Sequence, residues 1–383
     1  MSPEEEKLSK REFIRKSLLG AGGMVCCPFL LRGNSGQNVH FRDGKPWKWS
    51  REAMHYISTP RGIKCRTCPN ECDIKEGEAG DCRTKEVVGG KLYTIAYGNP
   101  CSVNIDPMEK KPLHHFHPGT RVLSIATAGC NLACLNCQNW EISQRSPRET
   151  RNYDLMPPKV VELAIQENCP SIAYTYSDPV AFYEYTLDTS ILARQAGLGN
   201  VIVSAGFINP RPLKDLCRVI DAANIDLKSF SDDIYAMLNA GKLQPVLDTL
   251  LTLKEEGVWL EITNLLVPTW TDDMKMIGEM CRWLVKNGFA DTPLHFSRFQ
   301  PMYKLNRLAP TPVSTLDQAR KTALDEGMHF VYVGNVPGHP AQDTLCPNCG
   351  KTLVVRKGYQ VSMPLLKNGK CASCGKSIPG VWD

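Results

Sequence analysis

Short runs of β-branched residues alternate with amphipathic stretches from about residue 120 onward. Between the runs, apolar positions recur at helical spacing. This alternation predicts an α/β domain with a parallel sheet and right-handed crossovers, and six units predict a partial (β/α)6 barrel. A further run at residues 329–333 is predicted to add an edge strand. The six predicted strands are residues 121–127, 171–176, 200–205, 224–228, 258–265 and 292–299, and the helical patterns between them include residues 159–167, 180–197, 242–256 and 272–287.

A Cys-rich loop directly follows the first predicted strand. Cys130, Cys134 and Cys137 have C-x3-C-x2-C spacing and stand among loop-forming Gly and Asn residues. A [4Fe–4S] cluster usually has four Cys ligands, so three thiolates would leave one iron open to another group. Zinc and unmetallated core thiols are the alternatives, but structural zinc needs four ligands, and no Cys or His follows Cys137 within thirty residues.

Two more Cys groups flank the predicted barrel. The chain has 17 Cys, and their clustering favours metal sites over a disulfide framework. The C-terminal group has two C-x2-C knuckles around a predicted hairpin, which indicates a zinc ribbon with four thiolate ligands. The N-terminal group is less regular and predicts zinc, an auxiliary iron–sulfur cluster or unmetallated thiols. The groups are Cys65, Cys68, Cys72 and Cys82, then Cys346, Cys349, Cys371 and Cys374.

Length and charge limit the choice of architecture and partner. The chain has 383 residues, enough for one elaborated barrel with appendages. Its 45 basic and 40 acidic residues give a net charge of only +5, without a long basic run, so nothing indicates nucleic acid as a partner. The predicted organisation is a leader (1–40), a Cys-rich module (41–119), the barrel (120–338) and a zinc ribbon (339–383).

The predicted leader contains residues 9–16, which resemble a twin-arginine export motif with Lys10 in place of the first Arg. The uncharged stretch that follows, residues 17–31, is shorter than the roughly 20 apolar residues of a transmembrane helix. We therefore expect no transmembrane span. The leader is interpreted either as a signal for export or membrane tethering or as a flexible basic segment.

The cluster loop with its flanks 127–129 and 138–144, the D-x-K motif at 226–228, residues 333–336 and both flanking Cys groups occur in the order of a known family. The chain resembles the radical SAM enzyme of the AmmeMemoRadiSam system, which is similar to the pyruvate formate-lyase activating enzyme type. The resemblance implies a [4Fe–4S] cluster whose open iron binds S-adenosylmethionine (SAM). It also implies reductive cleavage of SAM to a 5′-deoxyadenosyl radical that abstracts hydrogen.

The same resemblance implies partners and a location. A low-potential electron donor such as ferredoxin or flavodoxin would supply the electron, and Memo-like and AMMECR-type proteins would associate with the chain. Because SAM and low-potential electrons are supplied in the cytoplasm, we expect the reaction there. The hydrogen would come from a partner protein or a substrate bound to it, with a free small metabolite as the alternative.

The site residues implied by the resemblance lie at the strand ends. Asp226 and Lys228 are expected to lie beside the cofactor as catalytic groups, and strand alternation sends both to one side; a structural ion pair is the alternative. Asp178 stands where the family usually has Glu, and its Ser-Asp-Pro context also fits a simple turn. Gln300 replaces an expected His and Asn136 an aromatic residue. The expected SAM contacts are Asn136, Ser177, Asp178, Ser204, Asp226, Lys228 and Gln300.

Two other functions are consistent with parts of the sequence. An iron–sulfur electron-transfer protein would use the same Cys loop without cleaving SAM, but it would not need carboxylates at the strand ends. A zinc-dependent scaffold or nucleic-acid-binding module would use the flanking Cys groups, but the chain lacks a basic face. His114, His115 and His117 are expected to be surface or packing residues.

Overall fold

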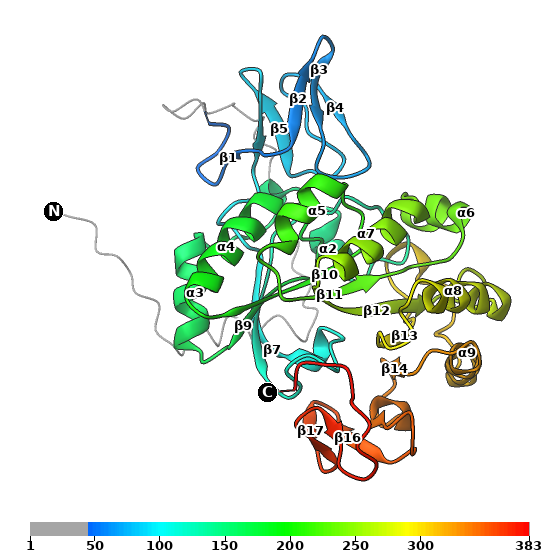
Figure 1. Ribbon diagram of the computed structural model, residues 1–383. Helices are drawn as coiled ribbons and strands as arrows, with labels where there is room; N and C mark the ends of the chain where they lie inside the picture. The colour runs from blue at the N-terminus through cyan, green and yellow to red at the C-terminus, as the bar shows by residue number, and fades with distance from the viewer. Residues whose placement is uncertain (1–44, 383) are drawn as a thin grey trace, which may run out of the picture.

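A twisted eight-stranded sheet forms the centre of the computed structural model, which describes residues 45–382 (Figure 1). The predicted leader therefore lies outside the described residues. The strand order is β14-β13-β12-β11-β10-β9-β8-β7; β8 to β14 pair in parallel, and β7 pairs antiparallel with β8. The strands are β7 (Ser102–Pro107), β8 (Arg121–Ala126), β9 (Ser171–Tyr174), β10 (Gly199–Ser204), β11 (Ala222–Asp226), β12 (Trp259–Leu266), β13 (Leu294–Arg298) and β14 (Val331–Gly334).

All six predicted parallel strands are present, and β14 is the predicted additional strand at the sheet edge. The antiparallel strand β7 precedes the region from which the barrel was predicted. Most positions of β8, β9 and β11 are buried, which explains why these strands read as nearly continuous apolar runs. The parallel α/β architecture is thus confirmed.

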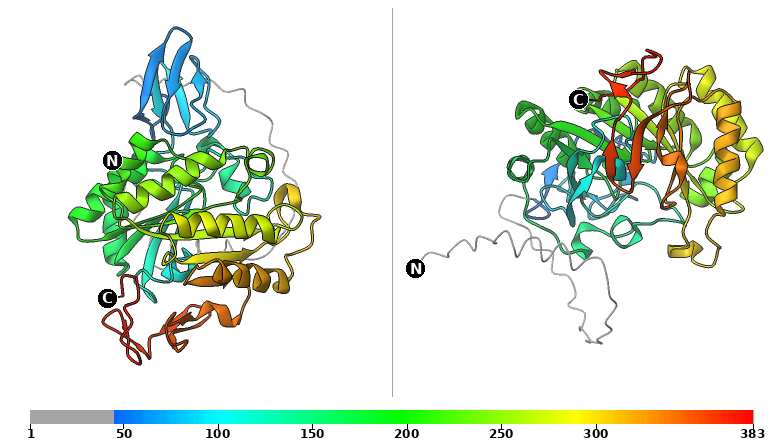
Figure 2. Two further views of the ribbon diagram at one scale, coloured as in Figure 1. Left: turned by 45° about the vertical axis from the view of Figure 1, so that its right-hand side comes forward. Right: turned by 90° about the horizontal axis from the view of Figure 1, so that it is seen from below.

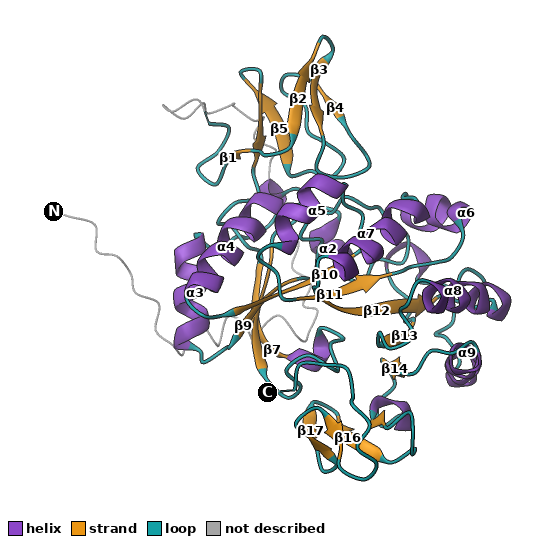
Figure 3. Cartoon of the chain, in the orientation of Figure 1, coloured by secondary structure: helices purple, strands orange, loops and turns teal. Residues whose placement is uncertain are grey.

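Helices connect the parallel strands and cover the outer face of the sheet (Figure 3). Asp273 illustrates how a local signal starts one of them: its side chain accepts a hydrogen bond from the Lys275 backbone N–H at the beginning of α8. Four helices, α2, α5, α6 and α9, lie outside the predicted helical ranges. The α-helices are α2 (Trp140–Ser143), α3 (Pro157–Gln166), α4 (Tyr183–Gln195), α5 (Pro210–Cys217), α6 (Asp232–Ile234), α7 (Leu243–Glu255), α8 (Met274–Lys286) and α9 (Val313–Asp325). The 3-10 helices are η1 (Met108–Lys110), η2 (Pro147–Glu149), η4 (Tyr303–Leu305) and η5 (Pro340–Gln342), and η3 (Tyr235–Asn239) is a π-helix.

Small β modules lie at opposite ends of the molecule, the N-terminal one in blue and the C-terminal one in red (Figures 1 and 2). Each has little apolar core of its own. The N-terminal strands are β1 (Arg51–Glu52), β2 (Tyr56–Thr59), β3 (Gly62–Cys65), β4 (Asp73–Ile74), β5 (Lys85–Val88) and β6 (Lys91–Thr94). The C-terminal strands are β15 (Thr344–Leu345), β16 (Thr352–Lys357), β17 (Gln360–Ser362), β18 (Leu366–Lys367) and β19 (Lys370–Cys371), so the predicted hairpin is present.

A buried polar network fastens the C-terminal module to the sheet. Glu261, near the start of β12, accepts hydrogen bonds from the backbone N–H groups of His114 and His115 and lies 2.7 Å from His295 Nε2. From the module, Arg356 donates to the His114 carbonyl at 2.6 Å. His114 and His115 are therefore packing residues. Among residues 45–382, no helix combines the length and hydrophobicity needed to cross a membrane.

Candidate functional site

A cavity of about 550 Å³ lies at the C-terminal ends of the parallel strands. Its wall combines the loop after β8 with residues at or beyond the ends of the following strands. Nine of the residues predicted for the cofactor site line it, although they come from four separate segments of the chain. They are Cys130, Cys134, Asn136, Cys137, Ser177, Asp178, Ser204, Asp226 and Lys228.

The three thiols of the loop after β8 are partly shielded from water. Burial raises the pKa values of Cys130 and Cys137, and the neighbouring thiols add to the shift. Cys130 Sγ accepts a hydrogen bond from the Leu132 N–H at 3.4 Å, and Cys134 Sγ accepts one from Asn239 Nδ2 at 3.2 Å. Buried thiolates are costly without a cation, so this donor set fits a metal centre better than three free ions.

The spacing of these thiols favours a polynuclear centre. A single zinc ion with Zn–S bonds of about 2.3 Å places its sulfur ligands about 3.8 Å apart. Within residues 45–382, only the C-terminal quartet has three or more ligand atoms within 4.8 Å of one another. Cys130, Cys134 and Cys137 are thus more widely spaced, as expected when each thiolate binds a different iron of one cluster.

Asn239 was not among the site residues predicted from the sequence. It lies in η3, more than a hundred residues beyond Cys134, and no local motif marks it. Asn136 gives a second signal, because its Oδ1 is buried at the cavity wall without a hydrogen-bond partner. An unpaired buried acceptor is costly, so a donor from a bound molecule would stabilise this wall.

Asp226 and Lys228 lie together in the wall, although β11 ends at Asp226 and strand alternation therefore does not extend to Lys228. Lys228 Nζ lies 2.8 Å from Asp226 Oδ2, and the Tyr235 hydroxyl accepts from the Lys228 N–H at 3.0 Å. Burial disfavours the charged ammonium, but the Asp226 carboxylate and Cys134 outweigh it and raise the pKa of Lys228. The cavity thus retains a lysine cation close to its thiols.

Asp178 is held by several hydrogen bonds. Its carboxylate accepts from the backbone N–H groups of Val180 and Ala205 at 3.0 and 2.8 Å, and from Ser204 Oγ at 3.1 Å. Burial nevertheless raises the pKa of Asp178. Ser177 Oγ donates to the Thr127 carbonyl at 2.7 Å. These contacts join the loops after β8, β9 and β10, and they leave Asp178 little remaining capacity to accept from a ligand.

Gln300 does not line the cavity. It lies beyond the end of β13 and is exposed to solvent. Its neighbour Phe299 is buried instead and donates its backbone N–H to Thr311 Oγ1 at 3.1 Å. The segment that follows returns to the cluster loop, where the Lys304 N–H donates to the Leu135 carbonyl at 3.1 Å, but the Gln300 side chain itself is exposed.

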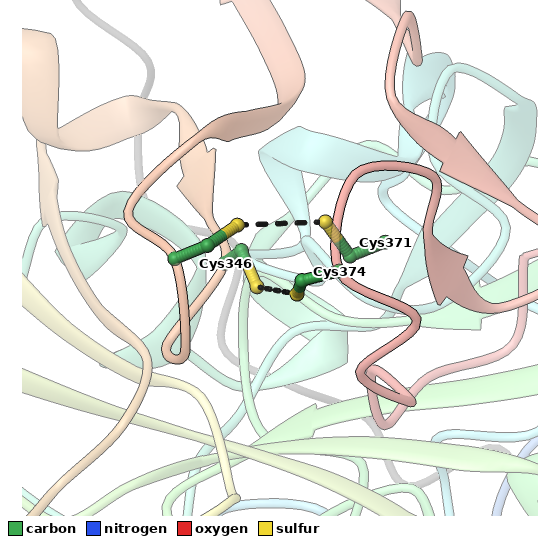
Figure 4. A group of neighbouring side chains, drawn as sticks. Cys346, Cys371 and Cys374 are labelled. Carbon is green, nitrogen blue, oxygen red and sulfur yellow. Dashed lines mark hydrogen bonds between the residues drawn. The ribbon is translucent and has the colours of Figure 1, made fainter.

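The C-terminal quartet brings its four thiols together (Figure 4). The sulfur atoms of Cys346 and Cys374 lie 3.6 Å apart, and those of Cys349 and Cys371 lie 3.7 Å apart. These separations match the roughly 3.8 Å of a tetrahedral ion with four thiolates. The N-terminal quartet lies in the opposite module, with Cys65 buried and Cys68, Cys72 and Cys82 partly buried.

Comparisons with known proteins agree with this arrangement. Residues 124–281 match the model of the radical SAM superfamily. The chain is 45% identical over 331 residues to uncharacterized protein MJ0808 of Methanocaldococcus jannaschii, covering 86% of this chain and 98% of that protein.

Solved structures with some similarity include a domain of an activating enzyme and a protein bound to S-adenosylmethionine. A domain of pyruvate-formate lyase-activating enzyme from Bacteroides vulgatus is 15% identical with a TM-score of 0.37, covering 43% of this chain and 98% of that one. SuiB of Streptococcus suis bound to S-adenosylmethionine is 12% identical with a TM-score of 0.46, covering 63% of this chain and 56% of that one.

Proposed function

The chain belongs to the radical SAM superfamily, and from this premise we propose that Cys130, Cys134 and Cys137 bind a [4Fe–4S] cluster that cleaves SAM. The observation that carries the proposal is the convergence of these thiols with Asp226 and Lys228 on one cavity. When bound, the cluster supplies the electron that converts SAM to methionine and a 5′-deoxyadenosyl radical, which abstracts hydrogen. The protein contributes ligation, orientation and shielding from water.

The cavity residues have separate roles in this proposal. Asn136, with its unpaired Oδ1, offers an acceptor to the cofactor. Lys228, paired with Asp226, offers a cation for the cofactor's carboxylate. Asp178 fixes the loops after β9 and β10, with one remaining acceptor position for the ammonium group. Ser177 and Ser204 complete the polar wall, while Gln300 would need a change in the loop after β13 to reach it.

Product analysis tests the proposal. Anaerobically reconstituted protein, incubated with SAM and dithionite, should release 5′-deoxyadenosine and methionine. Replacing Cys130, Cys134 or Cys137 singly by Ala should abolish this release, whereas Cys101→Ala should not, because Cys101 lies outside all three Cys groups. If the cluster forms and SAM binds but is never cleaved, the protein is instead an iron–sulfur electron-transfer protein.

Cofactor binding tests the role of Lys228. Lys228→Met should raise the Kd for SAM at least about tenfold, because truncating one member of a buried charged contact costs about 2–5 kcal/mol. Lys321→Met, which changes an exposed lysine on α9, is the matched control. Equal affinities of the two variants would remove Lys228 from the cofactor site.

The substrate side of the proposal rests on the sequence resemblance to the AmmeMemoRadiSam enzyme and the activases. A Memo-like or AMMECR-type protein docks near the cavity and donates the hydrogen atom, and a ferredoxin or flavodoxin supplies the electron. Cleavage of SAM should therefore be slow for the chain alone and faster when a Memo-like partner is added. Transfer of deuterium from a labelled small metabolite without any partner would contradict this assignment.

The C-terminal quartet is proposed to bind zinc in a ribbon. Its sulfur separations support one tetrahedral ion, and metal binding would stabilise a module with a small apolar core.

The partial six-unit barrel at 120–338, with modules at 41–119 and 339–383, remains our proposed division of the chain. We place the reaction in the cytoplasm, where SAM and reductant are supplied; fractionation of cells expressing the full chain would test this.

A further inference from the structure

The N-terminal module holds four thiols that the proposed SAM chemistry does not use. Cys65 is the last residue of β3. Cys68 and Cys72 lie in the segment between β3 and β4, and Cys82 lies shortly before β5. The Cys65 N–H donates to the Cys72 carbonyl at 3.0 Å, and Cys65, Cys72 and Cys82 all contribute to the raised pKa of Cys68, whose main cause is burial, so the four thiols lie around a common region. None of them forms a disulfide. Their arrangement is therefore that of a ligand set rather than of scattered core thiols.

The spacing of this quartet differs from that of the C-terminal quartet. The C-terminal thiols lie close enough for one tetrahedral ion. In the part of the chain that the structure describes, no three sulfur atoms of the N-terminal quartet fall within the same 4.8 Å limit. A single zinc ion needs sulfur atoms about 3.8 Å apart, whereas thiolates on different irons lie farther apart. Among the described residues, Cys130, Cys134 and Cys137 likewise form no compact group of the kind seen in the C-terminal quartet.

The environment of the quartet also suits an iron–sulfur cluster. Thr67 is buried, and its Oγ1 lies 3.5 Å from Cys65 Sγ. Once Cys65 is a thiolate, this hydroxyl donates to its sulfur. Hydrogen bonds to the ligating sulfur atoms and limited exposure to solvent are two of the factors that set the reduction potential of such clusters.

The quartet touches the loop that carries the first cluster. Gly129, directly before Cys130, packs against the Cys82 carbonyl so closely that an added Cβ would lie 2.6 Å from that oxygen. Gly129 has φ of 99°, which favours glycine there. Asn70, between Cys68 and Cys72, donates from Nδ2 to the Asn131 carbonyl at 2.9 Å. Ligand-bearing loops of both sites are thus in direct contact on both sides of Cys130.

We propose that Cys65, Cys68, Cys72 and Cys82 bind a second iron–sulfur cluster that passes electrons across the Cys82–Gly129 contact to the site at Cys130. The role as electron entry rests on the proposed function, but the metal content does not. One electron leaves a reduced protein donor of the ferredoxin or flavodoxin class, enters the N-terminal cluster and moves to the cluster at Cys130. The donor is oxidised by one electron, and no covalent bond changes.

Metal analysis tests the site without using activity. The triple variant Cys130→Ala/Cys134→Ala/Cys137→Ala, prepared anaerobically, should keep about two or four irons per chain, matching sulfide and about one zinc. Adding Cys68→Ala and Cys72→Ala should remove that iron and leave the zinc; adding Cys101→Ala instead should leave the iron in place. A triple variant with two zinc ions and no iron would overturn the proposal, even if the wild type cleaves SAM.

The relay is tested by comparing two reductants. Dithionite is small enough to reduce the Cys130 site directly through the cavity, whereas a protein donor must deliver electrons from the surface. In Cys72→Ala, the rate of 5′-deoxyadenosine release should fall at least about tenfold more with reduced flavodoxin than with dithionite. Equal losses with both reductants would show that the N-terminal site only supports the fold and would overturn the relay.

Discussion

Lys85 and Glu184 form a buried ion pair that joins the N-terminal module to the barrel. Lys85 Nζ lies 2.5 and 2.7 Å from the two carboxylate oxygens of Glu184, and both side chains are almost wholly shielded from water. Lys85 belongs to β5, and Glu184 belongs to α4, which flanks the cofactor cavity's sheet. Glu184 also accepts the Met54 N–H at 2.8 Å. This pair therefore holds the N-terminal Cys quartet against the barrel.

Glu184→Gln should destabilise the protein strongly. The substitution keeps the shape of the side chain but leaves the Lys85 ammonium buried without a counter-charge, which costs about 3–5 kcal/mol. The free energy of unfolding in urea measures the loss. Asp325→Asn is the control, because Asp325 pairs with Lys321 on the surface and should change stability by no more than about 1 kcal/mol. Equal losses in both variants would contradict a docking role for the pair.

Asn239 should tune the cluster at Cys134. Its Nδ2 donates to Cys134 Sγ at 3.2 Å, and such a bond stabilises the more negative, reduced cluster. Removing it in Asn239→Ala should make the reduction potential more negative by roughly 40 mV, equivalent to about 1 kcal/mol for one electron. Asn239→Asp should give a larger shift, since a carboxylate repels the reduced cluster. Asn287→Ala at the end of α8 is the control, and an unchanged potential in Asn239→Ala would refute the contact.

Local patterns predicted the elements of this fold better than the contacts between them. The six parallel strands follow from apolar runs, which depend on neighbouring residues only. The Asp226–Lys228 pair forms although Lys228 lies beyond the end of β11. The contact of Asn239 with Cys134 could not be predicted, because it depends on a distant turn reaching the loop after β8. Gln300 was expected at the site because it follows a strand, but at this strand end Phe299 is buried and Gln300 is exposed, which the strand pattern alone does not decide.

The C-terminal quartet should account for one zinc ion. Cys374→Ala should lower the zinc content by about one per chain and leave the iron at Cys130 unchanged, because Cys374 belongs to a compact ligand group that does not include Cys130, Cys134 or Cys137. Cys169→Ala, a core thiol outside the groups, should leave the zinc in place. A point substitution is preferable to deleting residues 340–383, because Arg356 donates to the His114 carbonyl and the deletion would expose that network. Unchanged zinc in Cys374→Ala would contradict the site.

Acid should weaken the junction between the C-terminal module and the sheet through His115. Its ring nitrogens lie 2.7 Å from the Pro379 carbonyl and 2.5 Å from the Tyr332 hydroxyl, and its side chain is fully buried. Burial lowers the pKa of His115 from 6.5 to about 4, although the nearby Glu261 opposes the shift. Between these two values the unfolded chain binds a proton that the folded protein does not. Stability therefore falls as the pH drops from about 6.5 to about 4.

The contribution of His115 to this loss should approach about 3 kcal/mol at the acid end, since each pKa unit corresponds to about 1.4 kcal/mol. His115→Phe keeps an aromatic ring among Trp259, Phe330 and Trp382 but cannot titrate. It should be less stable than wild type at pH 7, because two hydrogen bonds are lost, and its stability should depend less on pH below 6.5. Urea unfolding across this range measures both effects, with the exposed His329→Asn as control. Parallel pH profiles for wild type and His115→Phe would show that acid acts through other groups of the network, such as His114 and Glu261.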